Sequence, residues 1–174
     1  MKKWITILLL AFLLTGCGEQ GEFETVGDLY TPEALTPGTV SLTLPGDAAA
    51  QTFVGDGGRL YLCDGYSVTV QTLQGGDLAK TLQAVTGFSS ERLTVMETEK
   101  DGCRCYRFVW TAAGEGGDQI AQTVLLDDGN FHYAVTAMAD SKTGGQLSDI
   151  WQEIFQSVKL RGDGENSFPS GGSD

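Results

Sequence analysis

Three cysteines in the body of this chain have the spacing that most directly suggests chemistry. Cys63 stands alone, whereas Cys103 and Cys105 are two residues apart. Because side chains two apart on a strand point to the same side, either of the pair could meet Cys63. We therefore expect one disulfide, from Cys63 to Cys103 or to Cys105, with the third thiol buried. The alternative is a redox or soft-metal site, in which the guanidinium of Arg104 or Arg107 lowers a thiol pKa.

His132 is the only histidine, so acid–base schemes that use imidazole are limited to this side chain. A serine triad needs a histidine between a serine and a carboxylate, and the sequence has no Gly-x-Ser-x-Gly motif. Zinc would need a fourth ligand beside the three cysteines, and no Cys-x-x-Cys spacing occurs. We expect a structural role for His132, no enzymatic activity, and neither a metal nor a cofactor.

The charge balance of the chain is strongly acidic. Its 174 residues include 11 Lys and Arg against 23 Asp and Glu, for a formal net charge of −12. Nucleic-acid-binding proteins neutralise phosphates with basic side chains, so we exclude that class of partner. No Lys or Arg occurs between Gly18 and Gly58. The acidic residues in the first part of this stretch indicate a solvated segment.

The N-terminal segment has the pattern of an export signal. Lys2 and Lys3 precede an apolar core from Ile5 to Leu14, about ten residues long, where a transmembrane helix needs roughly 20. The segment closes on Leu14-Thr15-Gly16-Cys17, which resembles the lipobox of bacterial lipoproteins. The resemblance implies cleavage before Cys17 and attachment of diacylglycerol to its thiol. We therefore expect a lipid-anchored protein on the extracytoplasmic face of the cell membrane.

We expect four parts along the chain. Residues 1–16 are the signal peptide, 17–38 the lipidated cysteine with a flexible acidic stalk, 39–161 one globular domain, and 162–174 a disordered tail. Pro32 and Pro37 keep the stalk extended. The tail is rich in Gly, Ser and acidic residues and cannot bury enough apolar surface to offset its ordering entropy.

Asp-Gly pairs between β-rich runs predict three hairpins, because this pair supplies the positive φ that tight turns require. The predicted turns are Asp64-Gly65, Asp101-Gly102 and Asp127-Asp128-Gly129-Asn130. The second and third hairpins, 93–113 and 119–139, follow each other and predict a four-stranded antiparallel meander. Tyr106, Phe108 and Trp110 share one face of its long strand. We expect that face to be packed and the other face to be wetter.

Two amphipathic helices are predicted against this sheet. The first begins with Asp77 as its N-cap and runs to Ala84. The second, the C-terminal helix, has apolar residues at spacings of three and four, namely Leu147, Ile150, Trp151, Ile154, Phe155 and Val158. Lys159 and Arg161 would favour the negative end of its dipole, and Gly162 would end it. We expect its apolar face to cover the aromatic face of the sheet.

The order of these elements resembles that of a known superfamily. The likeness rests on strand 40–45, the aromatic strand 106–110, Asp128-Gly129 before 131–136, and the helical segment 150–160. In these features the chain resembles the PsbP-like and DcrB-like superfamily of exported α/β domains. The resemblance implies an accessory protein that docks onto larger membrane assemblies. It carries no functional residue across position by position.

Together these patterns predict an α+β fold with an antiparallel sheet of six or seven strands. The C-terminal helix and the shorter helix cover this sheet. We expect a non-enzymatic accessory or binding lipoprotein of the cell envelope, whose partner is another envelope protein or a small ligand. The alternative is an extracytoplasmic thiol redox or metal-binding protein that uses Cys63, Cys103 and Cys105.

Overall fold

The computed structural model describes residues 35–46, 48–52, 58–114 and 117–161. The chain divides into two units, 1–34 and 35–174, and the described residues belong to the second. The predicted signal peptide, the lipidation site Cys17, the tail and most of the stalk therefore lie outside the described residues. Within those ranges, no helix has the length and apolar character that crossing a membrane requires.

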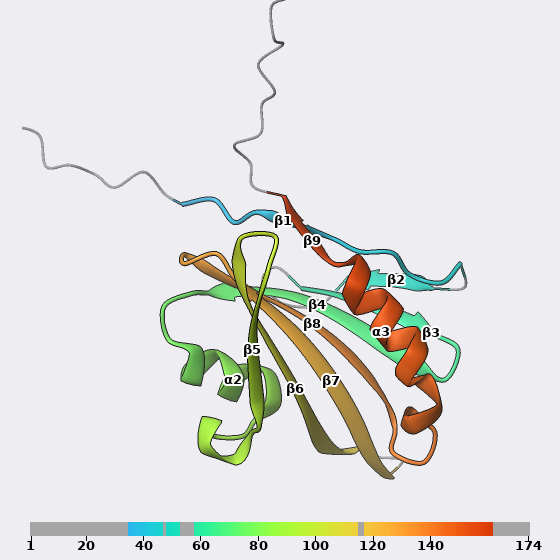
Figure 1. The fold of residues 1–174 in the computed structure, drawn as a ribbon. Coiled ribbons are helices and arrows are strands. Elements are labelled where there is room, and N and C mark those ends of the chain that lie inside the picture. Colours follow the sequence, from blue (N-terminus) through green and yellow to red (C-terminus); the bar gives the residue numbers. More distant parts are fainter. Residues whose placement is uncertain (1–34, 47, 53–57, 115–116, 162–174) are drawn as a thin grey trace, which may run out of the picture. The chain divides into compact units, whose positions relative to one another are not determined.

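The core of the fold is a seven-stranded, wholly antiparallel sheet, shown in Figure 1. Its spatial order is β2 (Ala49–Thr52), β3 (Gly58–Cys63), β4 (Tyr66–Gln74), β8 (Phe131–Asp140), β7 (Gly117–Asp127), β6 (Cys103–Gly114) and β5 (Val95–Lys100). This confirms the predicted α+β class and the sheet of six or seven strands.

The predicted hairpins are confirmed at their turns. Gly65, Gly102 and Gly129 have φ values of 77°, 78° and 94°, which is the left-handed region that glycine adopts without a steric penalty. The second and third hairpins form the expected meander β5-β6-β7-β8. After the first hairpin the spatial order departs from the sequence order, because β4 pairs with β8 and so joins the first hairpin to the meander.

A separate two-stranded sheet joins the two ends of the described chain. β1 (Thr39–Ser41) pairs with β9 (Lys159–Arg161), so that Thr39 lies opposite Arg161. The sequence pattern predicted Lys159 and Arg161 at the negative end of the last helix and Gly162 at its stop. This was wrong, because the helix ends at Ser157 and the chain then extends to pair with β1.

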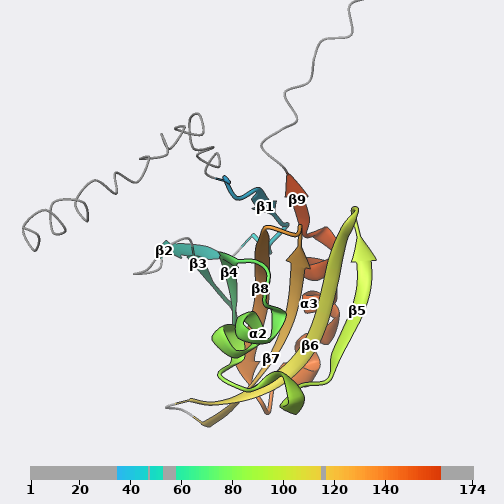
Figure 2. The same cartoon turned by 90° about the vertical axis from the view of Figure 1, so that its left-hand side faces the viewer.

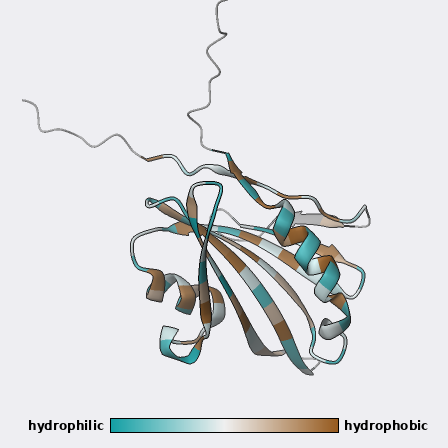
Figure 3. Ribbon diagram, viewed as in Figure 1, coloured by the Kyte–Doolittle hydropathy of each residue, from teal (hydrophilic) through white to brown (hydrophobic). Residues whose placement is uncertain are grey.

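The two helices pack on opposite faces of the sheet, as Figure 2 shows. α2 (Leu78–Thr86) lies on the aromatic face, where Leu82 packs with Tyr106, Phe108 and Trp110. α3 (Ser148–Ser157) packs on the other face. The prediction that the last helix covers the aromatic face was therefore wrong. Both faces carry a buried cluster, and the central strands have long apolar stretches interrupted by a few polar residues (Figure 3).

The N-terminal end of α2 is capped by the predicted side chain, and a glycine closes its C-terminal end. Asp77 is the N-cap, and its carboxylate accepts the N–H of Lys80 at 3.2 Å. Gly87, with a φ of 78°, follows the helix and donates its N–H to the carbonyl of Gln83 at 2.8 Å. This left-handed glycine turns the chain toward the short 3₁₀ turn η1 (Ser90–Arg92).

Candidate functional site

The structure does not bring the three cysteines together. Cys63 ends β3, whereas Cys103 and Cys105 lie on β6, and three strands separate β3 from β6. The row of paired residues that starts at Cys63 runs through Tyr66, Ala139 and Ile120 to Thr111. Four strand spacings of about 4.8 Å therefore separate Cys63 from Thr111, the residue of β6 in its own row. A disulfide needs Cα atoms within about 7 Å, so neither cysteine of β6 is in reach of Cys63. The described residues form no disulfide.

The environments of Cys103 and Cys105 do not favour reactive thiolates. Cys105 is fully buried in the cluster beneath α3. Cys103 is half-buried, and burial, with help from the carboxylates of Asp128, Asp101 and Asp127, raises its pKa. The redox alternative required a guanidinium to lower a thiol pKa, and at Cys103 the shift has the opposite direction. Within the described ranges, no group of His, Cys, Asp and Glu side chains has the arrangement of a metal site.

His132 belongs to a buried polar chain that the sequence analysis missed. Its Nδ1 is 2.6 Å from the hydroxyl of Thr81 on α2, and its Nε2 is 3.6 Å from Oδ2 of Asp127. That same carboxylate oxygen is 2.7 Å from the guanidinium of Arg104. Thr81, His132 and Asp127 are 4%, 1% and 5% exposed, whereas the side chain of Arg104 is largely in solvent.

Local structure accounts for this chain of contacts. Asp127 and His132 are paired across the β7–β8 hairpin. Thr81, near the start of α2, contacts His132 from the helix side. Thr81 also lines a pocket of about 370 Å³ with Asp77 and Lys80 on its rim. The hydroxyl is nevertheless almost wholly buried and is bonded to the imidazole. The contacts therefore attach α2 to the sheet through satisfied polar groups.

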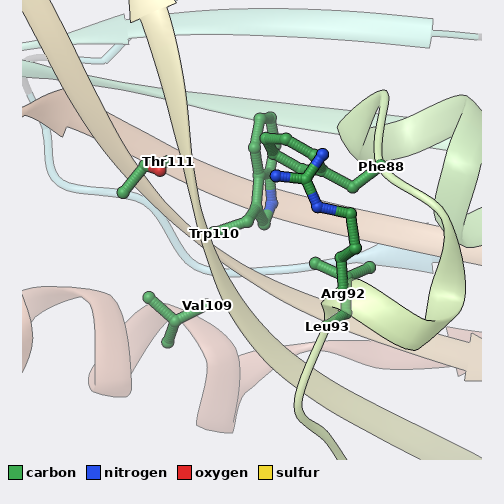
Figure 4. A pocket seen from close by; sticks show the side chains of 6 residues that line it. All are labelled: Phe88, Arg92, Leu93, Val109, Trp110 and Thr111. Atoms are coloured by element: carbon green, nitrogen blue, oxygen red, sulfur yellow. The ribbon is translucent and has the colours of Figure 1, made fainter.

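A second pocket lies where β6 meets the loop after α2, and we call it the edge pocket (Figure 4). It has a volume of about 280 Å³ and is lined by Phe88, Arg92, Leu93, Val109, Trp110 and Thr111. The guanidinium of Arg92 lies over the ring of Phe88, 5.0 Å from its centroid. Trp110 forms part of the wall and is only 9% exposed. The pocket therefore combines apolar walls with a cation at its rim.

Hydrogen bonds hold the aromatic walls of the edge pocket in place. The indole N–H of Trp110 donates to Oγ1 of Thr123 at 3.1 Å. The hydroxyl of Thr86 donates to the carbonyl of Leu82 at 2.7 Å and accepts the N–H of Phe88 at 3.0 Å. These bonds fix the start of the loop that carries Phe88 and Arg92, so the pocket is formed before a ligand arrives.

Arg92 has no acidic partner within the part of the chain that the structure describes. The ion pairs found there involve Lys80, Arg104 and His132 instead. Arg92 is exposed, and its planar group can bind a carboxylate through two parallel hydrogen bonds. The site is thus suited to an apolar group that carries a negative charge. Sequence reasoning passed over Arg92 because a lone arginine in a short turn has no pattern of its own.

Comparisons with known proteins support the fold. No family model matches the chain, and no curated protein matches its sequence. A crystal structure from Bacteroides thetaiotaomicron has a TM-score of 0.51 at 14% identity and covers 72% of this chain. This chain covers 46% of that protein, less than half of its length.

A second solved structure has a similar fold. The cyanobacterial PsbP (CyanoP) from Synechocystis sp. PCC 6803 has a TM-score of 0.51 at 8% identity, covering 78% of this chain and 98% of that one. LpqN from Mycobacterium tuberculosis, described as involved in cell envelope biogenesis, has a TM-score of 0.47 at 14% identity, covering 76% and 88% of the two chains. At such identities only the fold is shown, and the likeness to CyanoP agrees with the α+β architecture that the sequence predicted.

Proposed function

We propose that this chain is a membrane-anchored extracytoplasmic lipoprotein and acts as a non-enzymatic accessory module. It binds its partner through the edge pocket. The observation that carries the proposal is the placement of Arg92, a guanidinium held over Phe88 at the rim of an apolar pocket. Preformed apolar walls with one charged group that sets orientation are typical of binding sites.

The N-terminal pattern supports the location of this module. The sequence Leu14-Thr15-Gly16-Cys17 predicts a diacylglycerol on Cys17, and acyl chains contribute about 0.8 kcal/mol per buried CH₂. Two or more such chains hold a domain at the membrane for long periods, whereas a single chain binds only reversibly. The domain would therefore meet partners that lie at the same membrane face.

The buried polar chain supports binding rather than turnover. A catalytic hydroxyl must reach its substrate, yet Thr81 is 4% exposed and its hydroxyl is bonded to His132 at 2.6 Å. The far end of the chain, Arg104, is paired with Asp127 at 2.7 Å. These groups stabilise the position of α2, whose following loop forms the edge pocket.

The test is crosslinking in intact cells of a bacterial host, followed by affinity capture of the full-length protein. Wild type is compared with Arg92→Gln and with Arg59→Gln, an exposed arginine on β3 outside the edge pocket. We expect one reproducible partner with wild type and Arg59→Gln, and a clear loss with Arg92→Gln. Equal recovery with all three proteins would place the binding surface elsewhere.

The anchor is tested separately by mass spectrometry of the purified protein. We expect the mature chain to begin at Cys17 with a diacylglycerol on its sulfur, and Cys17→Ser to be released from the membrane fraction. An unmodified sulfur at position 17, or intact precursor in the cytosol, would contradict the proposed location. A capture experiment without a reproducible partner, together with a featureless ligand screen, would contradict the binding role.

A further inference from the structure

One edge of the main sheet is only half covered. β6 runs from Cys103 to Gly114, but β5 pairs with it only as far as Phe108, which lies opposite Val95. Beyond Phe108, β6 is bonded to β7 on one side and has no ladder partner among the described residues on the other. Figure 2 shows β6 continuing past the start of β5. This half of β6 is therefore an open strand edge.

The register shows which main-chain groups point to the open side. The two-residue turn Asp101-Gly102 is closed by the pair Lys100–Cys103, which is hydrogen-bonded in a hairpin of this kind. Along a regular antiparallel ladder, residues bond alternately to one neighbour and the other. The register of β6 runs without a bulge on both sides. The main-chain groups of Thr111 and Ala113 therefore point away from β7, toward the open edge.

The β6–β7 hairpin leads independently to the same result. Its closing pair is Gly114–Gly117, so the bonds from β6 to β7 are made by the even-numbered residues from Gly114 back to Arg104. Thr111 and Ala113 are exposed, and Val109 is 55% exposed. Unpaired N–H and C=O groups in a row are a template for another strand.

The edge pocket lies at this open edge. Part of its wall is formed by the first three residues of β6 past the end of the pairing with β5, namely Val109, Trp110 and Thr111. A strand added there would alternate its side chains between the two faces of the sheet. Those on the α2 face would meet Phe88 and the guanidinium of Arg92 (Figure 4).

We infer that an extended peptide segment of a partner protein pairs with β6 at residues 109–113 as an additional strand and places a carboxylate on Arg92. The inference rests on the proposed binding function and names the class of partner. The peptide carries an acidic and a large apolar residue two positions apart, because both must point to the α2 face. The main chain supplies affinity, and Arg92 with its apolar walls supplies selectivity.

Charge favours a peptide from another protein over a second copy of this chain. Two copies paired edge to edge by a two-fold axis would bring two identical edges, each with its own Arg92, into one interface. Each chain also carries a formal net charge of −12. Like charges oppose such an association, whereas a carboxylate on the peptide complements Arg92.

The test uses the full-length protein in detergent and a labelled, capped octapeptide, Thr-Val-Thr-Phe-Thr-Glu-Thr-Val. Fluorescence anisotropy gives its affinity for wild type and for Arg92→Gln, with Arg59→Gln as the matched control. We expect Arg92→Gln to weaken binding about tenfold, as for the loss of one charge-assisted contact. The same peptide with Gln in place of Glu should bind wild type and Arg92→Gln equally.

Strand pairing is tested through the main chain. Thr111→Pro removes an N–H that points to the open edge and leaves the β6–β7 ladder intact, so we expect at least about tenfold weaker binding. Thr111→Val keeps this N–H and should lose much less. A peptide N-methylated at alternate amides should not bind. In wild type, bound peptide should slow hydrogen exchange of the Thr111 and Ala113 amides, which tests the pairing even if the proline variant fails to fold.

Three outcomes would overturn the inference. The first is binding that survives both N-methylation and Thr111→Pro, because that would leave only a simple anion site at Arg92. The second is a concentration-dependent dimer of wild type that Thr111→Pro abolishes, which would assign the edge to a second copy. The third is no binding of octapeptides that carry the Phe-x-Glu pair in any register. If crosslinking still recovers an Arg92-dependent partner in that case, the proposed function stands and only strand addition fails.

Discussion

The hydroxyl of Tyr133 donates a hydrogen bond of 2.7 Å to Oδ2 of Asp128, which lies in the turn between β7 and β8. The same hydroxyl accepts the N–H of Gly38 at 2.8 Å, just before β1 begins. The side chain of Tyr133 is fully buried. One phenol therefore connects the turn to the segment through which the chain enters the domain.

Removing this hydroxyl should loosen the entry segment. We expect Tyr133→Phe to lower the free energy of unfolding by about 1–2 kcal/mol, because Gly38 and Asp128 lose a shared partner. Tyr61→Phe, a half-buried tyrosine on β3, is the control and should change it by less than about 0.5 kcal/mol. Urea denaturation measures both. Equal effects would show that the contact with Gly38 contributes nothing to stability.

The same contact predicts how stability depends on pH. Burial, together with the hydrogen bond to Asp128, raises the pKa of Tyr133 from 10.0 to about 12. A raised pKa in the folded state contributes stability that is complete below the unfolded value and is lost as pH rises through the folded value. The stability difference between wild type and Tyr133→Phe should therefore shrink between pH 10 and pH 12. Urea midpoints at pH 8, 10 and 11.5 measure it, and a constant difference would contradict this prediction.

The buried contact between Thr81 and His132 should be important for the docking of α2. We expect Thr81→Val to lower the free energy of unfolding by about 1–3 kcal/mol, because Nδ1 of His132 stays buried without its partner. Thr94→Val, at an exposed threonine before β5, is the control. Hydrogen exchange should rise in α2 before it rises in the sheet. A uniform rise across the domain would contradict a local role for this bond.

Local features of the fold could be predicted from the sequence because their causes are local. The Asp-Gly turns work through the φ values of single residues, as at Gly65 and Gly102. Asp77 caps α2 with a bond to a residue three positions away. The apolar stripe of α3 is a property of one helix, and Trp151, Ile154 and Phe155 are buried as predicted, whereas Ile150, also predicted on this stripe, is 39% exposed.

The errors concern contacts between distant parts of the chain. β9 has only three residues, and its partner β1 lies at the other end of the domain, so no local pattern marks it as a strand. Alternation on β6 separates Trp110 from Cys105, but it does not say which helix covers which face. The structure settles this choice, since α2 packs on the face that carries Leu73 and α3 packs on the other.

The candidate site could be predicted only in part. The sequence predicted the hairpin over 93–113 with its turn at Asp101-Gly102, but the open edge of β6 appeared only in the register of the structure. Phe88 and Arg92 belong to a loop without periodicity, so their position beside Trp110 needed the structure. The predicted disulfide from Cys63 to Cys103 or Cys105 failed for a different reason. That two side chains point to the same side of one strand says nothing of the strands that lie between Cys63 and β6.

Gly75 should tolerate no side chain. Its N–H donates to the carbonyl of Asn130 at 2.9 Å, and a Cβ at this position would lie 2.6 Å from the main-chain carbon and oxygen of Asn130. We expect Gly75→Ala to lower the free energy of unfolding by about 1–3 kcal/mol, because main chain must shift to make room. Gly46→Ala, where a Cβ meets nothing within 4 Å, is the matched control. Thermal denaturation compares them, and equal melting temperatures would refute the close approach.

Lys100 closes the C-terminal end of α3, the role that the sequence analysis had assigned to Lys159 and Arg161. Its ammonium group donates to the carbonyls of Phe155 and Gln156, both at 2.9 Å, from the far end of β5. These carbonyls have no partner within the helix, and a cation there also favours the helix dipole. We expect Lys100→Met to lower the free energy of unfolding by about 1–2 kcal/mol while keeping the apolar stem.

The control for this change is Lys142→Met, which removes an exposed lysine in the turn before α3. Burial lowers the pKa of Lys100, so its folded state releases the proton more readily than the unfolded chain does. A lowered lysine pKa means that the charged form is the costlier one to keep in the folded protein. Because the unfolded chain holds this proton more tightly, wild type gains stability relative to Lys100→Met as pH rises, so the loss caused by Lys100→Met should be larger at pH 10 than at pH 7. Urea denaturation at pH 7 and 10 measures this, and equal losses from Lys100→Met and Lys142→Met at pH 7 would show that the two bonds do not stabilise α3.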